Sequence, residues 1–396
     1  MQFIKPTFWQ QILESMLANL SLGEIKVTFP NKEIKIFIGK KPGPVANIEF
    51  LTDGAIKQTI LGGSLGFCEA VISGEIISTE IHKIIEIGGY EKSGLNTSGK
   101  GYYLFKLINK VFHFFNSNSI SGSKKNISTH YDLGNNFYKL WLDKSMTYSS
   151  AFFGGEKISL GKAQEKKYLK ISKIAELQKK NKILEIGCGW GGFAEFAAKH
   201  YNSIITAITI SKQQFEFTQN RIMEAGLNTE VEIKLIDYRK IKGKFDRVIS
   251  IEMIEAVGEK YWPIYFRQIR KLLNYNGKAA IQVITIDDKY FKNYKKFPDF
   301  IQKYIFPGGM LPSISALEKP IADSGLKIEK IESFGEDYAS TLSIWRKHFN
   351  SAWPEISKLG FDKKFYRMWN LYFSYCEGGF RSGSIDVKQI KLSPIK

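Results

Sequence analysis

A glycine-rich segment carries the clearest chemical signal in the sequence. Gly187, Gly189 and Gly191 follow an apolar run, and Glu185 lies two residues before the first of them. Glycines at the end of a strand let the backbone approach a ligand closely before a helix begins. The Gly-x-Gly-x-Gly spacing favours S-adenosylmethionine over a dinucleotide, whose fingerprint has a wider third spacing. We therefore expect Glu185 and the three glycines to bind S-adenosylmethionine.

Asp237 and Tyr238 form a second polar group, at the end of a later expected strand. The carboxylate of Asp237 could accept a hydrogen bond from the adenine amino group, and the ring of Tyr238 could lie on the base. A purely structural role is the alternative for Asp237.

Strand and helix patterns alternate from Lys182 onward. This order predicts an α/β fold with a doubly wound, mostly parallel sheet, which binds ligands beyond the carboxyl ends of its strands. The catalytic domain is expected at residues 126–396. Strands are predicted at 183–186, 204–208, 231–236, 247–251 and 279–286, and amphipathic helices at 193–200, 212–225 and 261–273.

The amino-terminal part predicts a small α+β accessory domain at residues 1–100, and it contains no catalytic constellation. Apolar and polar residues alternate there as in half-buried strands. The expected elements are an amphipathic helix at 1–20, strands at 24–29, 33–38 and 46–51, and a short α+β tail at 55–80.

A basic and aromatic linker is expected at residues 101–125, with a helix at about 103–116. Such a helix could lie on anionic lipid headgroups. It could equally pack between the domains. RNA binding through stacked aromatic rings is a third option, although no recognisable RNA-binding motif accompanies it.

Composition and charge narrow the class of protein. The 396 residues favour two domains, and 57 basic against 39 acidic residues give a net charge of +18. This charge indicates a polyanionic partner, either nucleic acid or an anionic membrane surface. No apolar run reaches the ~20 residues that cross a bilayer, and the start lacks a signal-peptide pattern. Cys68, Cys188 and Cys376 match no zinc or disulfide pattern, so we expect no metal site and a cytoplasmic location.

Six motifs resemble those of the cyclopropane fatty acid synthases, in the order of that family. The amino-terminal segments Gly63–Glu69 and Gly74–Glu75 also resemble the small accessory domain of the family. The six motifs are His130–Asn135, Met146–Ala151, the glycine loop, Thr209–Gln214, Phe306–Ser313 and Tyr375–Arg381.

The resemblance implies a Rossmann-like S-adenosylmethionine-dependent methyltransferase that acts on unsaturated acyl chains of membrane phospholipids. The cis double bond would attack the sulfonium methyl group, and loss of a proton from the new methyl group would close a cyclopropane ring. An alkene is a weak nucleophile, so the site must exclude water and align the reactants. The expected partner is an anionic phospholipid membrane, on whose inner face the protein would bind peripherally. No nucleic acid partner is expected, and the chain could form a homodimer.

The resemblance also implies a bound bicarbonate ion as the base, held by a glutamate, a tyrosine, a histidine and a Tyr-Ser-Cys-Ala segment. Glu255 and Tyr338 match the glutamate and the tyrosine. Ser150 stands in place of the cysteine, and Gln282 in place of the histidine. Both can still donate a hydrogen bond, but Gln282 cannot titrate. Bicarbonate binding and ring closure are therefore expectations that these two departures put in question.

For the cofactor, the resemblance implies Tyr148 and Ser149 at the methionine moiety, Thr209 and Gln214 near the ribose, and Tyr238 by the adenine. Cys376 matches a cysteine that is sometimes assigned an active-site role. The mechanism needs no thiol nucleophile, so a small packed cysteine is the alternative.

Three alternatives stay open at this point. Loss of a different proton from the same cation would give a methyl- or methylene-branched chain. A methyltransferase acting on RNA or on a small molecule is a second alternative. A lipid-binding protein with a decayed catalytic domain is a third, against which the retained glycine loop, Thr209 and Glu255 argue. The sequence leaves acyl chain length, double-bond position and headgroup undetermined.

Overall fold

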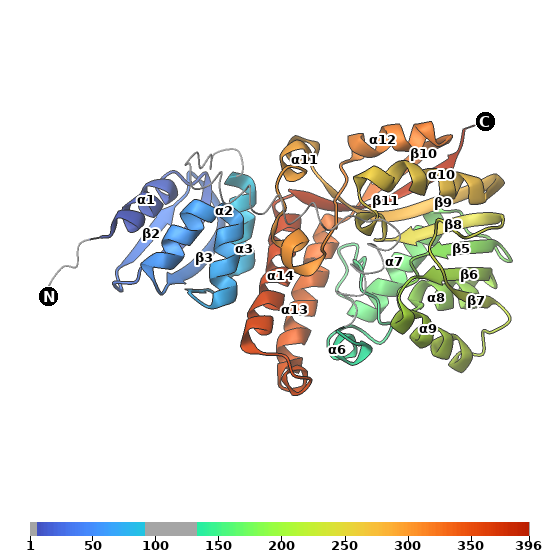
Figure 1. Cartoon of the computed structure of the whole chain (residues 1–396), viewed down its shortest axis with the longest axis horizontal. Coiled ribbons are helices and arrows are strands. Elements are labelled where there is room, and N and C mark those ends of the chain that lie inside the picture. Colours follow the sequence, from blue (N-terminus) through green and yellow to red (C-terminus); the bar gives the residue numbers. More distant parts are fainter. Residues whose placement is uncertain (1–5, 92–132, 396) are drawn as a thin grey trace. The chain divides into compact units, whose positions relative to one another are not determined.

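The computed structural model describes residues 6–91 and 133–395 (Figure 1). These residues form two compact units, each built from segments that are distant in the sequence. Of the described residues, the first unit comprises 6–91, 293–305 and 342–384, and the second comprises 133–292, 306–341 and 385–395. The predicted linker and its helix lie outside the described residues.

The first unit contains a small sheet in the order β2-β1-β3-β4, together with helices. Strand β1 runs antiparallel to β2 and parallel to β3, and β4 runs antiparallel to β3. Helix α14 packs against α2 and α3. The elements are α1 (Phe8–Leu17), β1 (Leu22–Thr28), β2 (Ile34–Ile38), β3 (Lys41–Phe50), α2 (Asp53–Ser73), β4 (Ile76–Ile77), α3 (Ile81–Glu91), η3 (Ile301–Ile305) and α14 (Lys363–Arg381).

The three strands predicted near the amino terminus are confirmed, although β3 begins five residues earlier than expected. The predicted first helix is shorter, because Thr7 caps it by accepting a hydrogen bond from the Gln10 backbone N–H. The predicted boundaries of 1–100, 101–125 and 126–396 follow the order of the chain. The two units instead group residues by contact, so 342–384 belongs with the amino-terminal elements.

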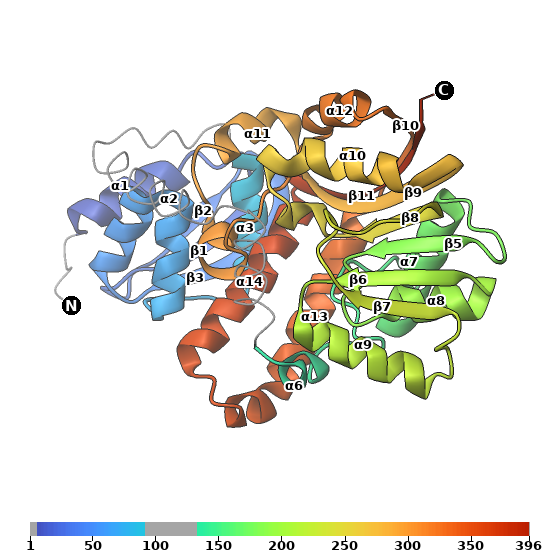
Figure 2. The same cartoon turned by 45° about the vertical axis from the view of Figure 1, so that its right-hand side comes forward.

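The second unit is built on a seven-stranded sheet in the order β10-β11-β9-β8-β5-β6-β7 (Figure 2). Strands β9, β8, β5, β6 and β7 run parallel, whereas β11 is antiparallel to both of its neighbours. The strands are β5 (Lys182–Ile186), β6 (Ile204–Thr209), β7 (Val231–Leu235), β8 (Phe245–Ile251), β9 (Leu273–Ile286), β10 (Leu326–Ser333) and β11 (Ile385–Pro394).

The predicted α/β fold is confirmed, since each predicted strand and helix of this region has its counterpart. In the sheet, β6 lies on one side of β5, and β8, which comes later in the chain, lies on the other side. The strand order therefore reverses at β5. Ligands of such sheets bind at this reversal, beyond the carboxyl ends of the strands. The helices are α6 (Asn135–Lys139), α7 (Leu160–Ile174), α8 (Gly192–Tyr201), α9 (Lys212–Glu224), η1 (Ile254–Ala256), η2 (Glu259–Tyr261), α10 (Trp262–Leu272), α11 (Asp288–Tyr294), α12 (Ile314–Asp323) and α13 (Gly335–Lys358). Two of them, α11 and α13, contain a boundary between the two units.

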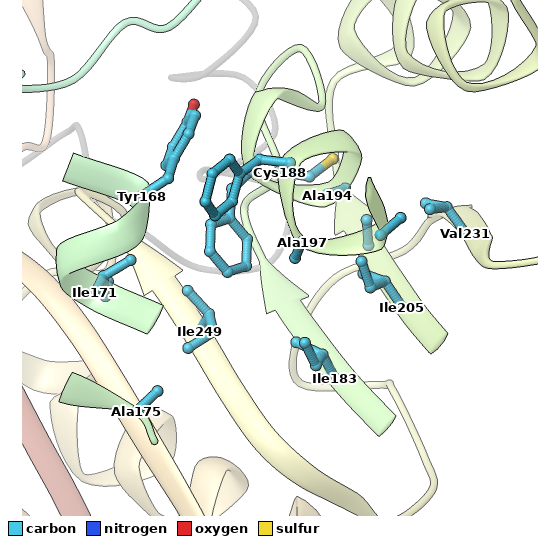
Figure 3. Packing of buried hydrophobic residues seen from close by; sticks show 14 of the residues in the cluster. Tyr168, Ile171, Ala175, Ile183, Cys188, Ala194, Ala197, Ile205, Val231 and Ile249 are labelled. Carbon is cyan, nitrogen blue, oxygen red and sulfur yellow. The ribbon is translucent and has the colours of Figure 1, made fainter. Parts of the chain in front are cut away.

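A hydrophobic core fixes α7 and α8 against the central strands (Figure 3). Ile171 of α7 and Ala194 of α8 are fully buried, as are Ile183 of β5 and Ile249 of β8. Apolar burial at about 25 cal/mol per Å² is the main stabilising contribution of such a cluster. The core therefore holds the β5–α8 turn, which contains the glycine loop, in a fixed place.

No helix in the described ranges is long and apolar enough to cross a membrane.

Candidate active site

The glycine loop joins β5 to α8 and leaves an open space beside its middle glycine. Gly187, Gly189 and Gly191 have φ angles of 81°, 53° and 82°, which side chains of L residues rarely adopt. A Cβ on Gly191 would lie 2.5 Å from the Thr218 side chain, and one on Gly187 2.9 Å from Met253. A Cβ on Gly189 would meet nothing within 4 Å. This arrangement fits close approach of a cofactor to the backbone at Gly189.

Glu185 lies beneath this loop with part of its carboxyl group unpaired. The side chain is 3% exposed, and no donor from the described residues reaches its Oε2 atom. Burial raises the pKa of Glu185 to about 8, although the charges of Lys167 and Arg221 act in the opposite direction. A buried, unpaired oxygen costs free energy unless a ligand supplies a donor. The site therefore fits a cofactor that carries an amino group.

A buried lysine of α7, Lys167, supports the loop that contains Tyr148 and Ser149. Its Nζ atom donates a hydrogen bond of 2.7 Å to the Ser149 hydroxyl, and the side chain is fully buried. Burial lowers the pKa of Lys167 to about 7. Gln164, one turn earlier on α7, donates to the Ser149 carbonyl at 2.9 Å. The ring centroid of Tyr148 lies 5.5 Å from that of Trp141, and the two rings meet edge to face.

The turn between β6 and α9 brings Thr209 and Gln214 together. The Thr209 hydroxyl donates to Oε1 of Gln214 at 2.8 Å and accepts from the Ser211 backbone N–H at 3.1 Å. Ser211 in turn caps α9 by accepting from the Gln214 N–H. The two predicted ribose residues therefore form one buried polar group at the carboxyl end of β6.

Asp237 has a structural partner at the end of β7. Its two carboxylate oxygens accept hydrogen bonds from the Arg239 guanidinium at 2.8 and 2.6 Å. Burial opposes the charge of Asp237, but the bonds from Arg239 outweigh it and hold the pKa of the carboxyl below its usual range. The neighbouring Tyr238 is buried, and burial raises its pKa to about 12. The structural role for Asp237 is thus satisfied without a ligand.

Glu252, which the sequence reasoning missed, is the centre of a hydrogen-bond network at the carboxyl end of β8. Its Oε1 atom accepts from the Ser150 backbone N–H at 2.9 Å and from Nε2 of Gln282 at 2.7 Å. Its Oε2 atom accepts from the Tyr338 hydroxyl at 2.7 Å. The Ser150 hydroxyl donates elsewhere, to the Ala151 carbonyl. Three of the four predicted catalytic-pocket residues of this unit therefore meet at one carboxylate.

Glu255 lies one short turn further, in η1, and has a different environment. Its Oε1 atom accepts from the Ile284 backbone N–H at 2.6 Å, and its Oε2 atom has no partner among the described residues. Burial, together with the negative charge of Glu252, raises the pKa of Glu255 to about 8. Burial also raises the pKa of Glu252, but its three donors oppose that shift. Two carboxyl groups thus share this edge of the sheet with different proton affinities.

A second residue that the sequence reasoning missed, Gln389 of β11, fixes the Gln282 side chain. Both side chains are buried, and Nε2 of Gln389 donates to Oε1 of Gln282 at 2.9 Å. Since Oε1 is occupied, Gln282 presents its Nε2 donor to Glu252.

Cys376 belongs to α14 of the first unit, whereas the groups described above belong to the second unit. Burial, with the nearby charge of Asp299, raises the pKa of its thiol well above the usual range. A thiol in such surroundings is a poor nucleophile. Its active-site role stays a hypothesis, and a packed cysteine accounts for these observations.

Residues 119–390 match the protein family described as mycolic acid cyclopropane synthetase. The chain belongs to this family. The matched residues include the glycine loop of the second unit. The protein is therefore an S-adenosylmethionine-dependent methyltransferase.

Two relatives agree with this assignment. Tuberculostearic acid methyltransferase UfaA1 of Mycobacterium tuberculosis is 36% identical over 339 residues, which are 83% of this chain and 79% of the relative. The cyclopropane-fatty-acyl-phospholipid synthase of Escherichia coli is 36% identical over 264 residues, 67% of this chain and 66% of the relative.

A solved structure of the family shows the same fold. Mycolic acid cyclopropane synthase CmaA1, complexed with S-adenosylhomocysteine and CTAB, superposes with a TM-score of 0.64 at 27% identity. The match covers 68% of this chain and 97% of that one. S-adenosylhomocysteine is what S-adenosylmethionine becomes after it has given up its methyl group, so that complex supports S-adenosylmethionine as the cofactor.

Proposed function

We propose that this protein transfers the methyl group of S-adenosylmethionine to a cis double bond in the acyl chain of a membrane phospholipid and closes a cyclopropane ring. The observation that carries the proposal is the Glu252 carboxylate, held by Ser150, Gln282 and Tyr338 in the same unit as the glycine loop. A fixed negative charge stabilises a developing carbocation, and a carboxylate can accept its proton. Family membership favours an acyl substrate over RNA or a small molecule.

When bound, S-adenosylmethionine supplies an electrophilic methyl group on a sulfonium sulfur. Glu185 and the backbone at Gly189 would hold the methionine part. The space beside Gly189 is open, and Oε2 of Glu185 has no donor among the described residues. Thr209 and Gln214 would bind the ribose hydroxyls. Lys167 holds the Ser149 side chain by a hydrogen bond to its hydroxyl.

The expected bicarbonate ion fits these residues poorly. The Ser150 N–H, the Gln282 amide and the Tyr338 hydroxyl were expected to donate to it, and all three donate to Glu252. A second anion at this place would also face the charge of Glu252 in a partly buried site, which is costly. We therefore derive no step through bicarbonate.

A branched product is the second candidate, because a relative with 36% identity is named a tuberculostearic acid methyltransferase. In that case the cation would lose a proton from the chain to give a methyl branch, or a hydride shift along the chain followed by loss of a methyl proton would give a methylene branch. The residues at the site serve both outcomes.

Trideuteromethyl-labelled S-adenosylmethionine separates these candidates. The purified full chain is incubated with the labelled cofactor and vesicles of a mono-unsaturated phospholipid, and the acyl chains are analysed by mass spectrometry. Loss of a chain proton retains all three deuterons, whereas ring closure and a methylene branch both retain two. Mild catalytic hydrogenation then tells these two apart, because it saturates the methylene branch and leaves the ring. Parallel incubation with RNA tests the remaining alternative, and label in RNA alone would refute the lipid substrate.

We also propose an anionic phospholipid surface as the partner of the first unit. Ile34, Ile36 and Ile38 of β2 alternate along the strand, point to one face, and are 54%, 56% and 72% exposed. Large apolar side chains gathered on one surface are typical of interaction sites. The net charge of +18 favours an anionic bilayer as the occupant.

A further inference from the structure

We infer that the carboxylate of Glu252 takes the place of the expected bicarbonate ion and is itself the proton acceptor of the reaction. This inference rests on the proposed methyl transfer to an acyl double bond. It assigns a further catalytic residue, because Glu252 would touch the hydrogen that leaves the reacting chain.

The donors around Glu252 are the first argument. A carboxylate and a bicarbonate ion both present two oxygens on one planar carbon, so they suit the same set of donors. Ser150 and Gln282 supply two N–H groups to Oε1, and Tyr338 supplies one O–H group to Oε2. The Ser150 N–H and the Tyr338 O–H have one hydrogen each, so their bonds to the covalently attached anion leave neither of them for a free ion.

The backbone at Glu252 is the second argument. Its φ angle is 49°, in the left-handed region that residues other than glycine rarely adopt. The Glu252 backbone N–H donates to the Gln282 carbonyl at 2.8 Å, which holds this turn at the end of β8. A left-handed conformation is costly for a residue with a side chain and persists where the surroundings determine it, most often at functional sites.

The difference between the two glutamates is the third argument. Glu252 accepts three hydrogen bonds, whereas Glu255 accepts one at Oε1 and none at Oε2 from the described residues. The donors to Glu252 stabilise its ionised form and oppose the burial that raises its pKa, so of the two glutamates Glu252 is the one whose carboxylate form the surroundings favour. The raised pKa of Glu255 agrees with this division. Glu255 then serves as the neutral member of the pair.

The step balances without another reactant. The double bond forms a new C–C bond to the methyl carbon while the C–S bond breaks, and S-adenosylhomocysteine leaves. The C–H electron pair of the new methyl group then closes the ring, and the proton passes to Glu252. Oε2 is the acceptor, because Oε1 already has two donors and Oε2 has one. Glu252 returns its proton to water after the product leaves.

The test compares the wild-type chain with Glu252→Gln and Glu252→Ala in buffer freed of carbon dioxide. Glu232→Gln, at an exposed position on β7, is the matched control. We expect wild-type and control rates to stay within about twofold when bicarbonate is removed or added. Glu252→Gln keeps the shape of the side chain but should lose about 100-fold or more in rate, while its affinity for S-adenosylmethionine stays within about threefold. Acetate or bicarbonate should partly restore Glu252→Ala.

A binding measurement tests whether Glu252 takes the place of bicarbonate without relying on enzyme activity. Carbon-13 bicarbonate is titrated into each protein, and bound ion is detected by line broadening. We expect binding to Glu252→Ala and none to the wild type. Bicarbonate binding to the wild type, loss of its activity on depletion, or full activity of Glu252→Gln would each overturn the inference. A wild-type chain that methylates no lipid would refute the proposed function instead, and the titration would still show what occupies the anion position.

Discussion

Gln389 and Gln282 lie directly opposite each other on the antiparallel strands β11 and β9, and Nε2 of Gln389 donates to Oε1 of Gln282 at 2.9 Å. This bond determines which end of the Gln282 amide faces Glu252. A free amide could rotate and present its oxygen to the carboxylate, which would be repulsive. Gln389 is therefore a positioning residue for the Glu252 network.

Replacing Gln389 by leucine should leave Oε1 of Gln282 buried without a donor. We expect the free energy of unfolding to fall by about 1 to 3 kcal/mol and the rate to fall about tenfold. Urea unfolding and rates with labelled cofactor measure the two effects. The double variant Gln282→Leu/Gln389→Leu should lose little more than Gln282→Leu alone, because the residues act as a pair. Strictly additive losses would contradict this coupling.

The sequence located the glycine loop correctly because its signal is local. Gly187 to Gly191 follow a strand pattern and precede a helix pattern, so the turn could be predicted from neighbouring residues. The fold of the second unit followed from the same alternation of patterns, and the structure confirms it.

Glu252 could not be found in the same way. It lies three residues before Glu255, and the motif of the family drew attention to the latter. The deciding features are the left-handed φ angle of Glu252 and a donor, Ser150, that is 102 residues distant in the sequence. Gln389 depends likewise on a strand pairing across 107 residues. Such contacts exist only after the sheet has formed.

Lys167, in contrast, left a signal that could have been used. Leu160, Ala163, Ile171 and Ile174 form the buried stripe of α7, and Lys167 occupies a position within that stripe. A lysine at a core position is rarely buried without a partner or a function. The helical spacing alone therefore indicated an unusual lysine.

Replacing Gly189 by aspartate should abolish binding of S-adenosylmethionine. The space beside Gly189 is open, so the new carboxylate would enter the place expected for the methionine carboxylate. The φ angle of 53° adds strain of about 1 to 3 kcal/mol to any side chain there. Calorimetric titration measures the affinity.

Gly226→Asp is the control for backbone strain, since Gly226 has a φ angle of 68° and open space but lies at the end of α9. We expect it to lose comparable stability and to bind the cofactor as the wild type does. Equal affinities of both variants and the wild type would remove the cofactor site from the glycine loop.

Binding to vesicles should require anionic lipid and should weaken as salt is added. Exposed charges are screened beyond about 8 to 10 Å at physiological ionic strength, so the attraction of the +18 chain depends on ionic strength. Ile36→Thr keeps a β-branched side chain on β2 but removes apolar surface, and it should reduce sedimentation with vesicles. Equal sedimentation with neutral and anionic vesicles would contradict the proposed partner.

The pH dependence of stability should reveal the neutral form of Glu255. Burial and the charge of Glu252 raise the pKa of Glu255 from its ordinary value of 4.5 to about 8. A carboxyl group with a higher pKa in the folded chain binds more protons when folded, so its contribution to stability is complete below the unfolded pKa and is lost as the pH rises through 8.

Glu255→Gln resembles the protonated side chain and lacks this dependence. The free energy of unfolding of the variant minus that of the wild type should therefore increase as the pH rises from about 5 to 8. Urea titrations at several pH values measure this difference. Glu185 and Lys167 titrate in both proteins and cancel in this comparison. The exposed control Glu232→Gln should give a difference that is independent of pH, and the same flat result for Glu255→Gln would mean that Glu255 is ionised in the folded protein.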